Sequence, residues 1–497
     1  MRFLPEEEQR RLIAACFTRS ELTLEELWMR YFALGGSLSL LELDAYLNGL
    51  VTLPRVDRDM LAHAVNERLD EVTGPARAPY SHSVPDAKPL HGPLKALVDL
   101  LEGAHRAPPE RLPAIVAEAG RALDLKIGVY LADYDQRTLV PLRPGAAALD
   151  IETTVAGDVF RHAGTTVTPD GTLWTVLLDG VERLGVLEIV PDDGADPDDP
   201  ALREQCRWLA TLLGHLVTIT TKYGDGLDRR RRHRRRDSAA ELLWQSLPPL
   251  TGATERVVVG VSVQPAYDLS GTVFDYALSE ERAQLAMFDT GARTRNANTA
   301  AVTALTAYRA ARHAGASLTE QFAAVGAELA GLPDAPAVGG VLAELDLGTG
   351  VLRLLGAGHT APLIVRDGTA IPMAEPAAPR FGAPHPATRL RLEPGDLLTF
   401  CSRGMAETPD SAGEPFGRAR ITEQLGRDAG ELPPEIARRL TRAVLAHGGG
   451  GSRQDAGVLV ARLEGRRGGD QLGTWLESAR RSALDLGEDA AVDDDEE

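Results

Sequence analysis

A stretch dense in chain breakers divides this sequence into parts that fold separately. Seven of the 22 residues from Thr73 to Leu94 are glycine or proline. Proline lacks a backbone donor and fixes φ, and glycine favours turns, so this density excludes a regular helix or strand. We therefore predict a linker over residues 73–94, with different structures on its two sides.

Before this linker, apolar residues recur at helical spacing. Leucine, isoleucine and aromatic residues lie three or four positions apart through most of residues 1–72. Thr23 and Glu26 have the spacing of a capping box, and Gly35-Gly36 supplies a break further on. Residues 1–72 are predicted to form a helical N-terminal unit of about four helices.

Length, charge and cysteine content limit the class of protein. The 497 residues are about three times a typical domain of roughly 150 residues, so several domains are expected. Acidic residues outnumber basic ones by 72 to 53, and the net charge of −19 disfavours general binding of nucleic acid. The sequence contains no apolar run of about 18 residues, which a membrane anchor would need, so we expect a cytoplasmic protein. The three cysteines show no CxxC pairing that would indicate a disulfide framework or a zinc site.

The segment from 95 to 223 mixes helical and strand patterns. Two helical patterns and a strand come first, and two alternating stretches joined at Asp179-Gly180 predict a hairpin. A long helix is predicted from 202 to 221. Helices beside a meandering antiparallel sheet, with the strand Leu184–Ile189, resemble a GAF sensory domain. This resemblance implies an α/β sensor and no particular ligand.

Seven arginines and one histidine fill positions 229 to 236. A helical pattern follows directly, so residues 224–250 are predicted to form an arginine-rich linker helix. We favour a solvated helix that steers pairing with a second chain. An anionic partner surface or an RNA patch stays open, although no aromatic residue is interleaved with the arginines to stack on bases. With the long helix before it, this segment predicts a homodimer through the GAF-like domain and the linker helix.

An acidic composition marks residues 465–497. Eight aspartates and glutamates lie between 485 and 497, with few apolar residues among them. Such a composition cannot bury enough apolar surface to offset the entropy of folding. We predict a disordered tail over residues 465–497.

Strand patterns dominate residues 251–464, with helices between them. Val257–Val263 is rich in valine, and Val341–Leu347 and Val351–Leu355 flank a turn of two glycines and a threonine, which predicts a hairpin. This pattern indicates a layered domain of helices and sheets. The whole chain is therefore predicted to be an α+β multidomain protein.

The motifs of residues 251–464 resemble those of a metal-dependent protein phosphatase of the PPM type, in the branch that is similar to the stage II sporulation phosphatase E. The resemblance implies an α/β/β/α sandwich. It is carried by motifs in the expected order, which are Pro265–Asp268, Ser270–Tyr276, Phe288-Asp289, Gly356–Leu363, Glu393–Asp396 and Glu414–Gly417.

In such phosphatases, aspartates at strand ends hold two divalent cations that polarise the phosphate and activate a bridging water. By resemblance, the four aspartate positions fall here on Thr272, Asp289, Arg403 and Gln454. Only Asp289 keeps its carboxylate, and the turn after it is altered to Gly291–Thr294. Four negative charges are thus replaced by one negative charge, one positive charge and two neutral side chains.

This loss of charge predicts a pseudophosphatase with no bound metal. A positive charge about 4 Å from a divalent cation repels it by roughly 8 kcal/mol at an effective dielectric constant of about 20. Arg403 is expected to pair instead with Asp289 or Asp275. The remaining motif residues are expected to serve the backbone geometry, and they are Gly271, Gly358, His359 and Gly404.

Two functional hypotheses follow. In the first, a bacterial signalling protein with a GAF-like sensor and a phosphatase-like output domain binds a partner in a sigma-factor/anti-sigma-factor pathway. The partner is a regulatory protein of the anti-sigma-factor antagonist kind, and no cofactor is needed. In the alternative, the domain is an active serine/threonine phosphatase that acts on such an antagonist with Mn or Mg held by Asp289, Asp275 and Asp455. The charges at the degenerate metal positions favour the first hypothesis.

Overall fold

The computed structural model describes residues 5–20, 22–72, 92–191, 196–265, 267–334, 336–374, 378–450 and 455–465. Gln454, most of the predicted linker and nearly all of the predicted tail lie outside these residues. The chain divides into two compact units, 1–98 and 99–497, which are described separately.

The first unit holds four helices, as the apolar spacing predicts: α1 (Glu6–Arg19), α2 (Leu24–Ala33), α3 (Leu40–Leu47) and α4 (Arg55–Val72). The capping box is confirmed, because the Glu26 amide donates to the Thr23 hydroxyl (3.2 Å) and the Thr23 amide donates to the Glu26 carboxylate (2.8 Å). Ser39 and Glu42 form a second capping box before α3. The apolar faces of the helices meet in one core that includes Ile13, Leu27, Tyr31, Leu43, Tyr46 and Leu61.

The second unit begins with a mixed domain, here called the middle domain. Its antiparallel sheet has the strand order β3-β2-β1-β6-β5-β4. The predicted hairpin is present, with β5 and β6 joined at Asp179-Gly180. The helix α5 (Gly92–Ala104) comes first in the sequence. The elements that follow it are η1 (Pro109–Arg111), α6 (Leu112–Arg121), β1 (Leu125–Ala132), β2 (Thr138–Pro141), β3 (Leu149–Asp150), α7 (Val155–His162), β4 (Thr165–Val167), β5 (Leu173–Asp179), β6 (Glu182–Pro191) and α8 (Pro200–Thr221).

Side chains on one face of the middle-domain sheet pack against α7. Val176 and Leu178 of β5 pack with Val186 of β6 and with Phe160 of α7 in one buried cluster. Because successive side chains of a strand point to opposite faces, these residues define the sheet face that α7 covers. The helix α8 contacts β5 closely, and a Cβ on Gly214 would lie 1.9 Å from the Leu178 carbonyl oxygen.

The arginine-rich segment differs from its prediction. It contains two short helices, α9 (Gly226–Arg231) and α10 (Ser238–Ser246), instead of one solvated helix. Arg236 is 8% exposed, donates to Glu241 (3.1 Å) and lies 4.7 Å from the Tyr134 ring centroid. Arg234 forms two hydrogen bonds with Asp268 (2.7 and 3.1 Å). These arginines meet carboxylates and aromatic rings that are distant in the sequence, so the segment joins the domains on both sides.

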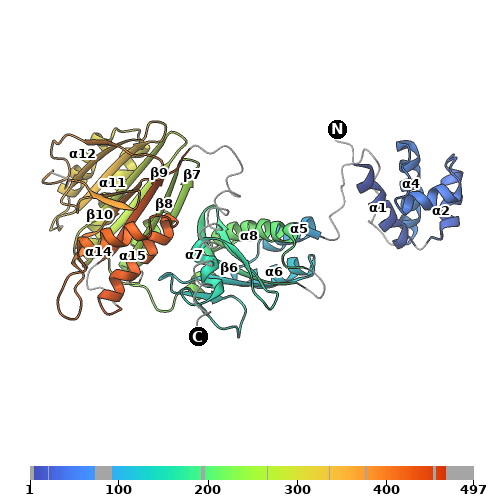
Figure 1. Cartoon of the computed structure of the whole chain (residues 1–497), viewed down its shortest axis with the longest axis horizontal. Helices are drawn as coiled ribbons and strands as arrows, with labels where there is room; N and C mark the ends of the chain where they lie inside the picture. Colours follow the sequence, from blue (N-terminus) through green and yellow to red (C-terminus); the bar gives the residue numbers. More distant parts are fainter. Residues whose placement is uncertain are drawn as a thin grey trace, which may run out of the picture. The chain divides into compact units, whose positions relative to one another are not determined.

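The C-terminal domain consists of two sheets between two layers of helices (Figure 1). One sheet has the order β15-β12-β11-β10-β9, and the other has the order β14-β13-β16-β17-β8-β7. Its elements are β7 (Thr251–Thr254), β8 (Val257–Gln264), β9 (Thr272–Leu278), β10 (Arg282–Asp289), α11 (Arg295–His313), α12 (Leu318–Ala330), β11 (Gly339–Asp346), β12 (Val351–Ala357), β13 (Leu363–Arg366), β14 (Thr369–Pro372), β15 (Thr388–Arg391), β16 (Leu397–Cys401), α13 (Arg403–Glu407), α14 (Gly417–Arg427), α15 (Pro433–His447) and β17 (Ala456–Leu463).

Alternation along β10 shows how the layers pack. Leu285 and Met287 join the core between the two sheets, whereas Ala286 and Phe288 join the core beneath α11 and α12. A third core lies between the second sheet and the helices α14 and α15. This arrangement is the α/β/β/α sandwich that the motifs predict. Among the described residues, no helix combines the length and apolar character of a membrane span.

The core between the sheets is expected to carry most of the stability of this domain. Phe274 is fully buried in it, so Phe274→Ala should lower the free energy of unfolding by about 3–5 kcal/mol through lost burial and a residual cavity. Denaturant unfolding followed by circular dichroism measures this change. Ile371→Ala is the control, because the Ile371 side chain is 47% exposed. An equal loss in both variants would contradict the assignment of this core.

Candidate functional site

Two adjacent strands of the first sheet end at the predicted site. Thr272 opens β9 and is the direct cross-strand partner of Asp289, which closes β10. Thr272 is fully buried, and its hydroxyl donates to Asp289 Oδ1 at 3.4 Å. Both residues occupy strand positions that point between the two sheets, together with Leu285 and Met287 of the same strand face. A carboxylate at position 272 would therefore stand beside that of Asp289.

Backbone donors hold the Asp289 carboxylate. The Gly291 amide donates to Oδ1 and the Arg403 amide donates to Oδ2, each at 2.8 Å. Two backbone donors of this kind hold a carboxylate in one orientation. Asp289 is buried, and its negative charge is compensated locally by polar groups of the chain itself.

The second sheet contributes Asp455, which directly precedes β17. Its Oδ1 accepts from Arg293 Nε at 2.8 Å, and its Oδ2 accepts from the Gly271 amide. Burial raises the pKa of Asp455, although Arg293 opposes that shift. Because Gly271 and Thr272 are neighbours, one short segment links Asp455 to Asp289 and brings both carboxylates to the same end of the sandwich.

Arg403 lies at this site but not in the predicted way. Its backbone amide bonds Asp289, while its guanidinium Nη2 lies 3.5 Å from the Gly358 carbonyl oxygen. Within the described residues its guanidinium forms no ion pair with Asp289 or Asp275, so the predicted side-chain pairing is wrong. The reason is geometric, since Arg403 is the first residue of α13 and its backbone amide, not its side chain, faces the end of β10.

Asp275 is placed away from the other two carboxylates. It lies three residues beyond Thr272 on the opposite strand face and pairs with Arg309 (2.8 Å) and Arg312 (3.1 Å) of α11. Its side chain is 2% exposed. Asp275 thus attaches α11 to the first sheet, and the proposed trio of Asp289, Asp275 and Asp455 is not brought together.

The remaining motif residues shape the backbone around the site. A Cβ on Gly271 would lie 1.8 Å from Thr290 Oγ1, and Gly358 has a φ of +57°. Burial lowers the pKa of His359, and its Nδ1 lies 2.9 Å from the Thr360 carbonyl oxygen. Gly404 is buried in α13, where its carbonyl oxygen accepts from the Thr408 hydroxyl.

Two residues of the site were not singled out from the sequence. Arg293 supplies the cation for Asp455, and the altered turn Gly291–Thr294 was its only signal. Ser402 accepts from the Gly457 amide and donates to the Asp455 carbonyl oxygen, each at 2.9 Å, which ties the end of β16 to the start of β17.

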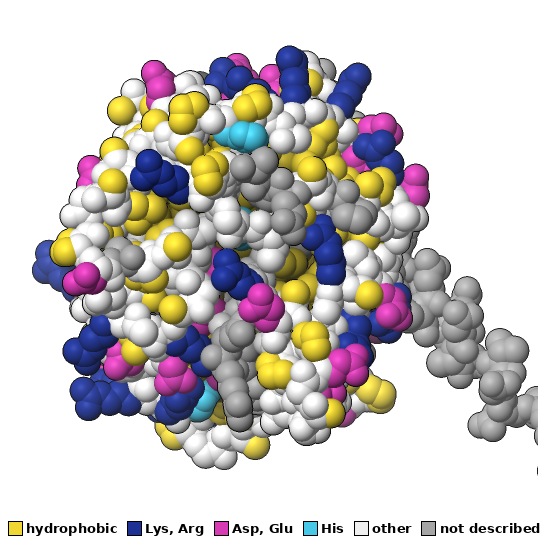
Figure 2. Space-filling view, turned by 90° about the vertical axis from the view of Figure 1, so that its left-hand side faces the viewer, with side chains coloured by type: hydrophobic (Ala, Val, Ile, Leu, Met, Phe, Trp, Pro, Cys, Tyr) yellow, Lys and Arg dark blue, Asp and Glu magenta, His cyan; other side chains and the backbone are white. Residues whose placement is uncertain are grey.

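The residues present do not form an evident metal centre. Among the described residues, no group of three or more His, Cys, Asp or Glu side chains is placed to hold a metal ion. Gln454, the fourth predicted position, lies outside the described residues. Figure 2 shows a face of the C-terminal domain on which basic, acidic and apolar side chains are interspersed.

The two sheets and their helical layers form the α/β/β/α fold that is typical of PPM-type phosphatase domains. Residues 295–464 match the family model described as stage II sporulation protein E (SpoIIE). This part of the chain is therefore similar to the SpoIIE family. No curated protein matches the chain at a significant level.

Solved structures that overlap this domain come from several phosphatases. The RsbU and RsbW domains of Rv1364c from Mycobacterium tuberculosis are 20% identical, with 45% of this chain and 70% of that chain covered and a TM-score of 0.40. The SiaA-PP2C domain of Pseudomonas aeruginosa is 18% identical, with 49% and 98% covered and a TM-score of 0.39. The catalytic domain of the serine/threonine phosphatase PstP, in complex with two manganese ions, is 18% identical, with 42% and 100% covered and a TM-score of 0.31.

The placement of Asp275 yields a testable distinction. Asp275→Ala leaves two largely buried arginines without their carboxylate and should lower the free energy of unfolding by about 3–5 kcal/mol. The loss should be the same with and without manganese chloride, measured by denaturant unfolding. Glu328→Ala, at an exposed carboxylate of α12, is the control. Stabilisation of the wild type by manganese that Asp275→Ala abolishes would assign Asp275 to a metal site instead.

Proposed function

We propose that the C-terminal domain is a pseudophosphatase that acts by binding a protein partner. The observation that carries this proposal is that both carboxylates of the site are already bound by groups of the chain. Arg293 pairs with Asp455, and the amides of Gly291 and Arg403 bond Asp289. A metal pair would have to compete with these donors for the carboxylate oxygens.

The charge balance supports the same proposal. Asp289 and Asp455 carry two negative charges, and Arg293 and Arg403 carry two positive charges at the same end of the sandwich. Two divalent cations about 3.5–4 Å apart need several carboxylates to offset their mutual repulsion. With Thr272 neutral and the two arginines in place, this end of the sandwich lacks the excess of carboxylates that two divalent cations require.

We propose that the partner is a regulatory protein of the anti-sigma-factor antagonist kind, in a partner-switching pathway. This proposal rests on the family of the C-terminal domain. Fluorescence anisotropy with labelled antagonist proteins, phosphorylated and unphosphorylated, tests it with the full chain. The exposed Arg403 guanidinium is the group expected to distinguish the two forms, so Arg403→Met should reduce any preference for the phosphorylated form.

Restoring the carboxylates should restore metal binding. We expect the wild type to hydrolyse a small aryl phosphate no faster in manganese than the Asp289→Ala variant does. The triple variant Thr272→Asp, Arg403→Asp and Gln454→Asp should bind manganese in isothermal titration calorimetry, because it supplies carboxylates at the three positions where the family resemblance expects metal ligands.

The matched control adds Asp289→Ala to the triple variant and should lose most of this manganese affinity. Hydrolysis by the wild type that requires both manganese and Asp289 would instead support the alternative, an active phosphatase that uses Mn or Mg.

We further propose that the middle domain is a GAF-like sensor and that the chain is a homodimer through α8. One side of α8 exposes apolar residues at helical spacing, with His215 among them, and this side is called the apolar stripe. Trp208 and Ile219 are each 50% exposed, and Leu212 lies between them on the same side. An exposed apolar stripe on a long helix is suited to pairing with the same helix of a second copy.

Trp208→Asp should therefore convert a dimer into a monomer at micromolar concentration, because it replaces a large apolar side chain of the proposed contact by a charged one. Size-exclusion chromatography with light scattering measures the mass. Ile371→Asp, at a comparably exposed apolar residue of β14, is the control and should leave the mass unchanged. A monomeric wild type would refute the proposed dimer.

A further inference from the structure

The middle domain receives a side chain of the C-terminal domain into its core. Leu432, directly before α15, is 7% exposed and belongs to the same buried cluster as Phe160 of α7 and Val186 of β6. A hydrophobic cluster of this kind usually defines the core of a single domain. The apolar core beneath α7 is therefore completed by a residue of the C-terminal domain.

A fully buried carboxylate lies next to this apolar contact. Glu435, in the first turn of α15, accepts from Arg183 Nη1 of β6 (3.2 Å) and from Arg438 Nη2 (2.7 Å). Burial alone would raise the pKa of Glu435, but hydrogen bonding and charge from Arg438 and the charge of Arg183 lower it to about 2. Arg439 of the same helix also pairs with Glu435 (3.1 Å), so the middle domain supplies one of three cations around this buried carboxylate, and removal of a partner of a buried charge is costly.

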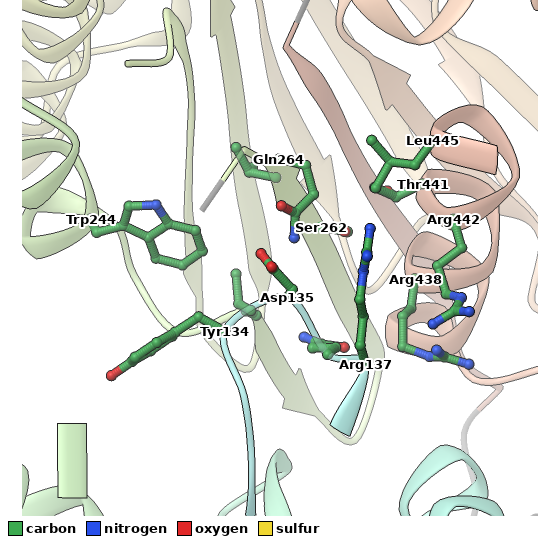
Figure 3. Close-up of a pocket in the computed structure, with 13 residues that line it drawn as sticks. Tyr134, Asp135, Arg137, Trp244, Ser262, Gln264, Arg438, Thr441, Arg442 and Leu445 are labelled. Carbon is green, nitrogen blue, oxygen red and sulfur yellow. The ribbon is translucent and has the colours of Figure 1, made fainter. Parts of the chain in front are cut away.

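The contact continues along α15. Glu152 of the middle domain accepts from Arg438 Nη1 (2.6 Å) and from Arg442 Nε (3.2 Å), one turn apart. Figure 3 shows a small cavity further along, where Arg137 and Asp135 of the middle domain lie near Thr441, Arg442 and Leu445 of α15. Three residues of α15, Glu435, Arg438 and Arg442, thus form ion pairs with the middle domain.

The same helix is packed against the strand that follows Asp455. Ile436 and Leu440 of α15 share one core cluster with Val458 of β17. The first turn of α15 also approaches β8 closely, because a Cβ on Gly260 would lie 2.1 Å from the Pro434 nitrogen. Closely packed elements shift together rather than independently. A displacement of α15 therefore also displaces the start of β17 and Asp455, which directly precedes this strand.

We propose that the middle domain controls the C-terminal domain by docking onto α15, with Leu432 and Glu435 held in a site that the middle domain builds from α7, β6 and Glu152. Release of this contact returns Glu435 and Arg183 to water together, so opening leaves neither charge buried and unpaired. A signal that repacks the core beneath α7 competes with Leu432 for the same space. The docked and released states thereby place α15 and the Asp455 strand differently.

Hydrogen–deuterium exchange of the full chain tests the proposal in both directions. Leu432→Ala should speed amide exchange in α7 and β6 by at least about tenfold, because the middle domain loses a core side chain. Arg183→Met should speed exchange in α15 and in residues 456–458 in the same way. No metal or phosphate substrate is involved, so the result does not depend on whether the site hydrolyses phosphate.

Two further variants make the outcome decisive. Leu305→Ala removes an equally buried leucine from α11, in the opposite helical layer, and should leave α7 and β6 at wild-type rates. Glu152→Gln, at a partly exposed side chain, removes only the outer ion pairs and should give a smaller increase in the same segments as Arg183→Met. Unchanged exchange in α7 and β6 after Leu432→Ala, or an equal change after Leu305→Ala, would overturn docking. Faster exchange in α15 without a change in residues 456–458 would overturn the coupling to the site.

Discussion

Compensation of buried carboxylates at the end of the sandwich is the constraint on which the C-terminal site depends. Two sheets that end together bring Asp289 and Asp455 out of water, and such charges are tolerated only when paired or hydrogen-bonded. This chain meets the requirement with Arg293 and with the amides of Gly291 and Arg403. The domain therefore keeps its fold with both carboxylates paired by groups of the chain, and this pairing is the observation on which the proposed binding function rests.

Arginine side chains also pair with buried carboxylates elsewhere in the second unit. Asp275 is compensated by Arg309 and Arg312, which attach α11 to the first sheet. Glu435 is compensated partly by Arg183, which comes from another domain. A guanidinium remains charged when buried and donates in a fixed fork, so it holds a carboxylate in one geometry. These sites differ in the origin of the arginine. An arginine from the same domain, as at Asp275, holds elements of that domain together, whereas Arg183 at Glu435 comes from a neighbouring domain and couples the two domains.

Local sequence patterns predicted helices and strands better than they predicted which side chains contact one another. The hairpin of β11 and β12 and the four N-terminal helices follow from periodicity, turn residues and capping, which depend on nearby residues. The short strands β2 to β4 were not predicted, because strands of two to four residues are too short to show a period. The arginine-rich segment was predicted to be solvated because its carboxylate and aromatic partners, such as Asp268 and Tyr134, lie elsewhere in the sequence.

The sequence by itself determined the layered fold, the loss of acidic character at Thr272 and Arg403, and the position of Asp289 at a strand end, since these follow from residue type and local pattern. Only the tertiary structure decided which groups pair with each buried carboxylate. Arg293 reaches Asp455 across 162 positions, Asp275 turns to the opposite strand face, and Arg403 contacts Asp289 through its backbone. The physical reason is that a side chain pairs with whatever the packed sheets and helices bring within a few ångströms, and that proximity is a property of the fold rather than of sequence spacing.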